Sequence, residues 1–314
     1  MNKLTIYYGK ELASYGFGED HPFGPDRLDA FWTEACAQGL DTSADIAAPV
    51  SAGRHDLELF HEHSYIEKLV NLSRFGSGYL DSGDTPAFPG IYEAACVVSG
   101  CVLDGLARIM SGQSERAFIP IAGLHHARRD GAAGFCAVND IGILVETMRK
   151  QYGIRRIAYV DIDAHHGDGV FYAYEEDPQL LFADIHEDGR QLYPGTGLAE
   201  ETGKGDATGT KLNIPLTPPA CTDEDFMQAW TRVEAFVRAA EPEFIILQAG
   251  ADSLAGDPIT HMQYTTAAHT HAARRLSDLA DEVCDGRLLA TGGGGYNRAN
   301  LAAAWTAVCT EMLA

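Results

Sequence analysis

The sequence predicts an α/β fold, in which a mostly parallel β-sheet is flanked by helices on both faces. Short runs rich in β-branched and aromatic residues alternate with longer stretches of helical pattern, which is the order of elements in a parallel sheet. Most of these short runs are continuously apolar, as expected for strands that are buried on both faces. Hydrophobic residues make up 46% of the 314 residues, so the chain can bury a large core.

The expected elements follow one another along the whole chain. The expected strands are LTIYY at 4–8, AFIPI at 117–121, RIAYVDID at 156–163, LLFADI at 180–185, EFIILQAG at 243–250 and RLLATGG at 287–293. Helical patterns cover 25–38, 91–109, 139–152, 223–240, 264–283 and 299–313. The segment 73–90 is rich in glycine and proline, and we expect it to be a surface loop. Because no repeat or Pro/Ser-rich linker divides the chain, we expect one domain over residues 1–314.

Composition restricts the class of partner. The net charge of −22 disfavours nucleic acid and anionic membranes as partners, and it favours cationic ligands such as lysine-rich peptides or polyamines. That the negative charge serves only to keep the protein soluble is an equally good explanation. The chain lacks a signal-like start and any apolar run near the ~20 residues of a membrane span. Seven cysteines without a C-x-x-C pair argue against disulfides, and we expect a cytoplasmic protein.

The motif YVDIDAHHGDGV, at 159–170, joins an apolar strand to three aspartates and two histidines. Alternate residues of an extended segment point the same way, which places Asp161, Asp163 and His165 on one side. Buried carboxylates are unfavourable unless they are paired or coordinated, so this cluster predicts a metal ion. A hydrogen-bonded polar turn is the alternative explanation.

A further carboxylate, Asp252, follows the strand EFIILQAG. Together with Asp163 and His165 it gives three protein ligands and leaves one position open, as in catalytic zinc sites. Alternatively, Asp252 caps a loop or a helix. The flanking positions lack the carboxylates that a second ion needs, so we expect one ion: these positions are Gly167, Gly250 and Leu254.

Two more motifs contain groups suited to proton transfer and to oxyanion binding. The loop GLHHARRDGAAGFCAVND, at 123–140, carries His125 and His126, for which Asp161 and Asp168 are available as partners. A histidine pair is otherwise more often structural or simply exposed. In TGGGGYN, at 291–297, Tyr296 follows a glycine run, and its hydroxyl could donate to a developing oxyanion. No lysine or serine follows the glycines as in a phosphate-binding P-loop.

Together these motifs resemble the zinc-dependent histone deacetylase family, which includes bacterial acetoin-utilisation deacetylases and acetylpolyamine amidohydrolases. The similarity extends from HPFGPDR at 21–27 to TGGGGYN at 291–297. It implies the arginase-deacetylase fold, with a central, mostly parallel sheet of about eight strands. It also implies an amidohydrolase with one Zn²⁺ per chain, for which Fe²⁺ or Co²⁺ can substitute because the ligands include no thiolate.

The resemblance implies a role for each matching residue. The implied metal ligands are Asp163, His165 and Asp252, and the implied catalytic residues are His125, His126, Asp161, Asp168 and Tyr296. The implied substrate contacts are Asp84 at the rim, Arg27 behind the site, and Gly134, Phe135, Tyr193 and Ile259 along an acyl-lysine tunnel. A monovalent cation such as K⁺ is implied beside Asp161, Asp163, His165, Asp184 and Ile185.

Four positions depart from residues that are common in eukaryotic members of the family: Leu124, Tyr193, Ile259 and Asp184. The first three leave the acyl-chain preference open, and the aspartate at 184 alters the charge of the cation site. The function we predict is hydrolysis of the acyl amide of an acyl-lysine side chain in a peptide or protein. Deacetylation of acetylated polyamines is the main alternative, and a non-catalytic module that binds acyl-amines is a third. The sequence does not predict an oligomeric state.

Overall fold

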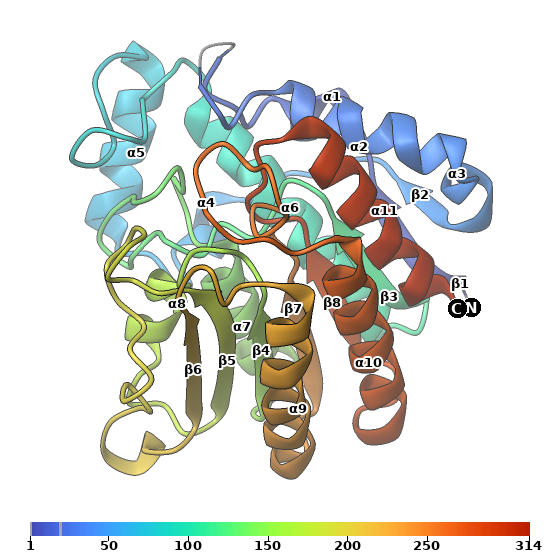
Figure 1. Cartoon of the computed structure of the whole chain (residues 1–314). Coiled ribbons are helices and arrows are strands. Elements are labelled where there is room, and N and C mark those ends of the chain that lie inside the picture. The colour runs from blue at the N-terminus through green and yellow to red at the C-terminus, as the bar shows by residue number, and fades with distance from the viewer. Residues whose placement is uncertain (1, 19–20) are drawn as a thin grey trace.

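The computed structural model describes residues 2–18 and 21–314 and contains one eight-stranded sheet in which every strand pairing is parallel (Figure 1). The strand order is β2-β1-β3-β8-β7-β4-β5-β6. The strands are β1 (Asn2–Tyr7), β2 (Asp45–Ala47), β3 (Ser114–Ile119), β4 (Ile157–Asp161), β5 (Leu180–Glu187), β6 (Lys211–Leu216), β7 (Phe244–Gln248) and β8 (Leu288–Thr291). The α/β class and the strand number implied by the family resemblance are therefore confirmed.

Helices cover both faces of this sheet (Figure 1). On one face α9, α10 and α11 contact the strands and α2 packs against α11, while on the other face α6 contacts β3 and α7 packs against α6. The longer helices are α2 (Asp26–Ala37), α5 (His63–Phe75), α6 (Ile91–Met110), α7 (Asp140–Tyr152), α9 (Asp223–Ala240), α10 (Thr266–Val283) and α11 (Arg298–Leu313). Shorter helical segments are α1 (Lys10–Ala13), α3 (Leu40–Ser43), α4 (Arg54–Leu57), α8 (Asp168–Ala173) and the 3₁₀ turn Gly205–Ala207.

The central strands are buried along their whole length, as their continuously apolar sequences predict. Every residue of β4, β5 and β7 is buried, because helices cover both faces of the sheet. The register pairs Asp161 of β4 with Gln248 of β7, and Gln248 with Thr291 of β8. The loops that follow these three strands therefore begin side by side at one edge of the sheet.

Three local expectations needed correction. The strands β2 and β6 did not stand out in the sequence, because β2 has three residues and β6 reads KLNIPL, with a lysine, an asparagine and a proline. Both are edge strands, where proline and polar residues are tolerated. The expected loop 73–90 is also shorter than predicted, because its first three residues form the last turn of α5, which ends at Gly76 in the left-handed conformation.

An aromatic cluster joins the sheet to the helices on one face. The ring of Phe118, in β3, lies 5.5 Å from that of Phe31 and 6.3 Å from that of Trp305, measured between centroids. All three side chains are fully buried. We expect Phe118→Ala to lower the free energy of unfolding by about 3–5 kcal/mol, because it removes these contacts and leaves a cavity.

Urea unfolding followed by circular dichroism measures this loss. Phe75→Ala is the matched control, because Phe75 is 77% exposed and its truncation should change stability by no more than about 0.5 kcal/mol. Equal losses for the two variants would show that the Phe118 cluster does not contribute as argued.

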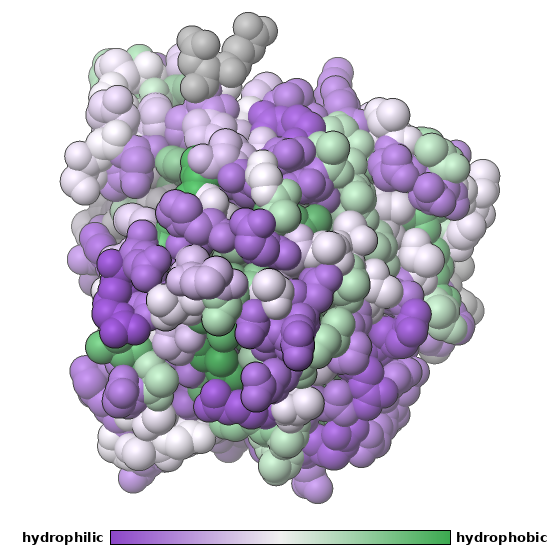
Figure 2. Space-filling view, viewed as in Figure 1, coloured by the Kyte–Doolittle hydropathy of each residue, from purple (hydrophilic) through white to green (hydrophobic). Residues whose placement is uncertain are grey.

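One face of the surface is predominantly polar. Figure 2 shows a face dominated by hydrophilic residues, with hydrophobic residues in small, scattered groups. Within residues 2–18 and 21–314, every helix is too short or too polar to serve as a membrane span. The start of β1 lies near the end of α11, where the Lys3 ammonium donates to the backbone oxygen of Ala314 at 2.7 Å.

Candidate active site

The predicted site residues come together at the carboxyl edge of the central strands. Asp163 and His165 follow β4, Asp252 follows β7, and the glycine run follows β8. His125 and His126 follow β3, which pairs with β8. In parallel α/β sheets this edge is where ligands bind.

Asp163, His165 and Asp252 form a compact, buried group. Their ligand atoms lie within 4.8 Å of one another, and this is the one such group found in the described part of the chain. The Nδ1 atom of His165 lies 3.1 Å from Oδ1 of Asp163 and 3.1 Å from Oδ2 of Asp252. An imidazole nitrogen and two carboxylate oxygens thus surround one point, which is the ligand geometry predicted from the motifs.

The charges of this group fit a bound dication. Burial, together with the neighbouring carboxylate of Asp163, raises the pKa of Asp252 to about 7. Burial alone lowers the pKa of His165, but its hydrogen bonds to Asp163 and Asp252 outweigh burial and raise that pKa to about 10. Without an ion, His165 is protonated, and its Nδ1–H lies within hydrogen-bond distance of both Asp163 and Asp252. A metal dication replaces that proton and compensates both negative charges.

Neighbouring groups fix the two carboxylates. Oδ2 of Asp163 accepts hydrogen bonds from the side chain of Gln248 at 2.9 Å and from the backbone N–H of Gly294 at 2.8 Å. Oδ1 of Asp252 accepts from the backbone N–H of Ala164 at 2.8 Å. A Cβ atom at Gly250 would collide with the carboxylate of Asp163, and one at Gly294 would collide with that of Asp252. The glycines are therefore needed for the backbone to approach the carboxylates.

The tandem histidines each bond to one aspartate and touch each other. Nδ1 of His125 lies 2.8 Å from Oδ2 of Asp161, and Nδ1 of His126 lies 2.7 Å from Oδ1 of Asp168. Their Nε2 atoms are 3.1 Å apart, so one of them carries a proton that the other accepts. These are the two histidine–aspartate pairs that the family resemblance implies.

The environments of the two histidines push their pKa values apart. Burial opposes the charge on His125, but the charges of Asp161 and Asp163 outweigh it and raise the pKa of His125 to about 9. Burial and the adjacent charge of His125 lower the pKa of His126 to about 4. At neutral pH His125 therefore carries the positive charge, and His126 is neutral and able to accept a proton.

A tunnel of about 270 Å³ leads from the surface to this group. Its lining contains Asp84, His126, Gly134, Phe135, His165, Leu192, Tyr193, Ile259 and Tyr296. It therefore contains each predicted tunnel and rim residue, and Leu192 in addition. The tunnel is mostly apolar between a carboxylate at its mouth and histidines at its floor, which suits an uncharged alkyl chain.

The glycine run places Tyr296 at the floor of the tunnel. Its ring lies 5.9 Å from that of Phe135, between centroids. The predicted back-wall residue, Arg27, is fully buried and donates to the backbone oxygens of Gly293 at 2.6 Å and Gly295 at 2.9 Å. Arg27 thus fixes the backbone on which Tyr296 is carried.

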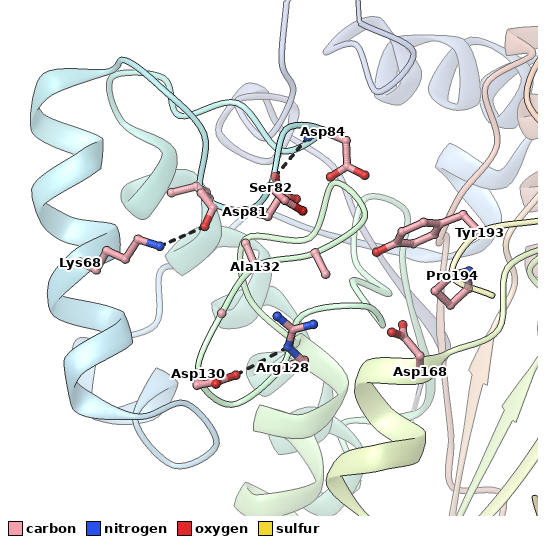
Figure 3. A pocket seen from close by; sticks show the side chains of 13 residues that line it. Lys68, Asp81, Ser82, Asp84, Arg128, Asp130, Ala132, Asp168, Tyr193 and Pro194 are labelled. Carbon is pink, nitrogen blue, oxygen red and sulfur yellow. Dashed lines mark hydrogen bonds and ion pairs between the residues drawn. The ribbon is translucent and has the colours of Figure 1, made fainter. Parts of the chain in front are cut away.

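A larger groove adjoins the mouth of the tunnel (Figure 3). We call it the rim groove. Its volume is about 610 Å³, and its lining includes Lys68, Asp81, Asp84, Arg128, Asp130, Asp168 and Tyr193. Asp84 and Tyr193 line both the groove and the tunnel. Figure 3 shows Asp84, Asp168 and Tyr193 at the tunnel end, with Lys68 of α5 at the opposite end.

The expected site for a monovalent cation contains a buried, hydrogen-bonded pair of Asp184 and His186. Asp184 is fully buried, and its Oδ2 accepts from the backbone N–H of Gly167 at 2.9 Å. Its Oδ1 lies 2.7 Å from Nδ1 of His186, whose Nε2 lies 2.9 Å from the backbone oxygen of Gly197. Both carboxylate oxygens of Asp184 are therefore engaged by the chain itself, and Ile185 beside it is buried.

Sequence reasoning missed several residues that support the site. Gln248 holds Asp163, and Asp140 accepts from the backbone N–H groups of Gly123 and Leu124, both at 2.8 Å, at the base of the histidine loop. The hydroxyl of Tyr159 donates to Asp161 at 2.5 Å. Gln248 and Asp140 share a signal, a polar residue at the end of an apolar strand or at the start of a helix, whereas Tyr159 lies in the middle of β4 and has no such signal.

The fold and this site together define an α/β enzyme of the arginase-deacetylase fold. The crystal structure of the HDA15 HD domain superposes with a TM-score of 0.91 at 27% identity, over 100% of this chain and 90% of that one. The model of the histone deacetylase domain matches residues 21–312, and the chain belongs to the histone deacetylase family.

Curated relatives cover nearly the whole chain. The acetoin utilization protein AcuC of Bacillus subtilis is 36% identical over 322 residues, which cover 99% of this chain and 82% of AcuC. Histone deacetylase clr6 of Schizosaccharomyces pombe is 30% identical over 97% of this chain and 75% of its own length. Membership of this family and these relatives support a hydrolase that acts on amides.

Proposed function

We propose that this protein is a zinc-dependent deacetylase that hydrolyses the acyl amide of N-acyl-lysine side chains in peptides or proteins. One observation carries the proposal: the buried Asp163–His165–Asp252 group lies at the floor of an apolar tunnel, beside two histidine–aspartate pairs. An acyl-lysine chain fits such a tunnel because its alkyl part is uncharged and its amide can reach the floor.

The proposed roles follow from where the protons lie. Asp163, His165 and Asp252 would hold a divalent ion, which would supply a Lewis acid and lower the pKa of water toward neutrality. His126 keeps a proton on Nδ1 toward Asp168, and its Nε2 accepts the proton of the attacking water in place of the hydrogen bond from Nε2 of His125. The charged His125 then supplies the proton that the departing amine needs.

Tyr296 completes the proposed mechanism. Its hydroxyl donates to the oxygen on which negative charge develops as the amide is attacked. Asp161 holds His125 in orientation through Nδ1, and Arg27 holds the backbone beside Tyr296. Because two carboxylates and one imidazole discriminate weakly among metals, Fe²⁺ and Co²⁺ should also support activity.

The rim groove supports a peptide substrate over a small acylated amine. Its volume of about 610 Å³ exceeds that of the tunnel, so it offers room for residues on either side of an acyl-lysine. Burial and the nearby Asp81 raise the pKa of Asp84 to about 6, so its ionised form is disfavoured. A cationic or N–H donor group of the substrate would stabilise that ionised form. Acetylated polyamines also bring a second cation to this rim, and they are the competing substrate class.

Parallel assays test the function and the substrate class. The metal-loaded protein is incubated with an acetyl-lysine peptide flanked by arginines, with the same peptide flanked by serines, and with acetylputrescine. We expect turnover in the order of that list, abolished by a chelator and restored by Zn²⁺. Binding without metal-dependent turnover of any of the three would instead support a non-catalytic acyl-amine module.

The separated histidine pKa values predict a bell-shaped pH profile for kcat/KM. Activity should rise on the acid side as His126, whose pKa is lowered, becomes neutral, and it should fall on the alkaline side as His125, whose pKa is raised, loses its proton. We expect His125→Ala to lower activity and to remove the alkaline fall. An alkaline fall that persists in this variant would assign it to another group.

A further inference from the structure

The segment 255–264 forms a loop between the metal ligand Asp252 and α10, and we call it the wall loop because it carries the tunnel residue Ile259. Its two ends meet, since the backbone N–H of Ala255 donates to the oxygen of Tyr264 at 2.9 Å. The hydroxyl of Thr260 donates to the backbone oxygen of Asp252 at 2.5 Å. The wall loop is thus tied to the backbone of a metal ligand.

A buried carboxylate ties the same loop to the catalytic tyrosine. Asp257 is 7% exposed, and its Oδ1 accepts from the backbone N–H of Ile259 at 3.1 Å. Its Oδ2 accepts from the backbone N–H of Tyr296 at 2.8 Å and from that of Asn297 at 3.4 Å. One rigid carboxylate therefore connects the tunnel wall with the tunnel floor.

The backbone before Tyr296 needs such an anchor. Four consecutive glycines precede Tyr296, and glycine restricts the backbone less than any other residue. Backbone hydrogen bonds to Ile119, Ala122 and Ala251 hold the first three glycines of the run. Three side chains add to them: Asp163 at the N–H of Gly294, Arg27 at two carbonyls, and Asp257 at the N–H of Tyr296. Asp257 is the group that accepts from the backbone N–H of Tyr296, while Arg298 donates to the backbone oxygen of Tyr296 at 3.0 Å and the Arg27 guanidinium lies 5.6 Å from the centre of its ring.

We propose that Asp257 is a positioning residue that fixes Tyr296 and Ile259 relative to each other, and that it thereby sets both the turnover rate and the discrimination between acyl chains. The inference rests on the proposed deacetylase function. Because Asp257 is absent from the tunnel lining, it acts through the placement of Tyr296. An error of about 1 Å in the placement of a catalytic group can lower a rate about 100-fold.

Kinetics of Asp257→Asn in the metal-loaded enzyme test this role. The new amide group cannot accept from all three N–H donors, so we expect kcat on an acetyl-lysine peptide to fall about 10- to 100-fold with little change in KM. The ratio of butyryl to acetyl turnover should also change. In a Tyr296→Phe background the same substitution should have a much smaller effect on kcat, because the two residues act as a unit. Equal losses in both backgrounds would overturn the proposal.

The rate of backbone amide hydrogen exchange can be measured in an inactive protein. It therefore tests the positioning role of Asp257 even if the protein is not a deacetylase. In Asp257→Asn we expect faster exchange in 257–262 and 292–297, and unchanged exchange in the central strands. Asp206→Asn, at an exposed aspartate, is the matched control and should leave all three regions unchanged. Unchanged exchange at 292–297 in Asp257→Asn would refute the anchor. If that variant does not fold, Asp257→Glu, which keeps both acceptor oxygens and the charge, enters the same assays with a smaller expected effect.

Discussion

Replacing Asp252 with asparagine is expected to leave the protein folded but unable to retain its metal ion, and therefore inactive. The substitution keeps the shape and the oxygen that accepts from Ala164, but it removes one of the two charges that compensate a dication. Metal content should fall from about one ion per chain to a small fraction of that, and deacetylation should fall with it. Elemental analysis of dialysed protein and a peptide assay measure the two losses.

Stability without metal provides an independent check. Burial and Asp163 raise the pKa of Asp252 to about 7, above its ordinary value, so the stability this carboxyl contributes is present at low pH and lost as pH rises through 7. Between about pH 4 and 7, the thermal stability of the metal-free wild type should therefore fall relative to that of metal-free Asp252→Asn. The exposed variant Asp278→Asn is the control and should retain both metal and activity. Full metal retention by Asp252→Asn would remove Asp252 from the ligand set.

Replacing Tyr296 with phenylalanine is expected to lower kcat by about 10²–10³ while metal content and stability stay unchanged. The phenyl ring keeps the packing against Phe135 and Phe23, and only the proposed oxyanion donor is lost. KM should change little, because the hydroxyl acts on charge that develops during the reaction. Steady-state kinetics with an acetyl-lysine peptide measure the effect.

Tyr79→Phe is the matched control for this substitution. Tyr79 is 54% exposed and lies outside the tunnel lining, so losing its hydroxyl should not alter turnover. A Tyr296→Phe enzyme that turns over at the wild-type rate would assign oxyanion binding to other groups. A variant that also loses its metal would show that Tyr296 supports the site and not only the reaction.

The sequence indicates the central part of the fold well and its edges poorly. The buried strands β4, β5 and β7 are readable because helices on both faces require continuous apolar runs. In β6, Lys211 is buried, with its ammonium donating to the backbone oxygens of Asp177 at 2.9 Å and Leu180 at 2.7 Å. A pattern of hydrophobicity cannot predict a lysine whose charge is accommodated by distant carbonyls.

The same limit applies to the site. The cluster Asp161, Asp163 and His165 could be predicted because its residues stand at alternate positions from the last residue of β4 onward. The contact of Asp257 with the backbone of Tyr296 could not, because it joins residues 39 positions apart through a backbone N–H that leaves no trace in the side-chain sequence. Chemistry carried by side chains is visible in a sequence, whereas positioning by backbone groups appears only in the structure.

The position of β8 has a consequence for how the chain is made. This four-residue strand lies between β3 and β7, yet it is the last strand in the sequence. Without β8, the strands β3 and β7 that flank it each lack a partner on one side, and an unpaired strand edge can join other chains. The arrival of β8 closes the sheet and brings the glycine run to Asp163. A nascent chain stalled before residue 288 therefore lacks both a closed sheet and a complete active site, and such a chain is a natural substrate for chaperones.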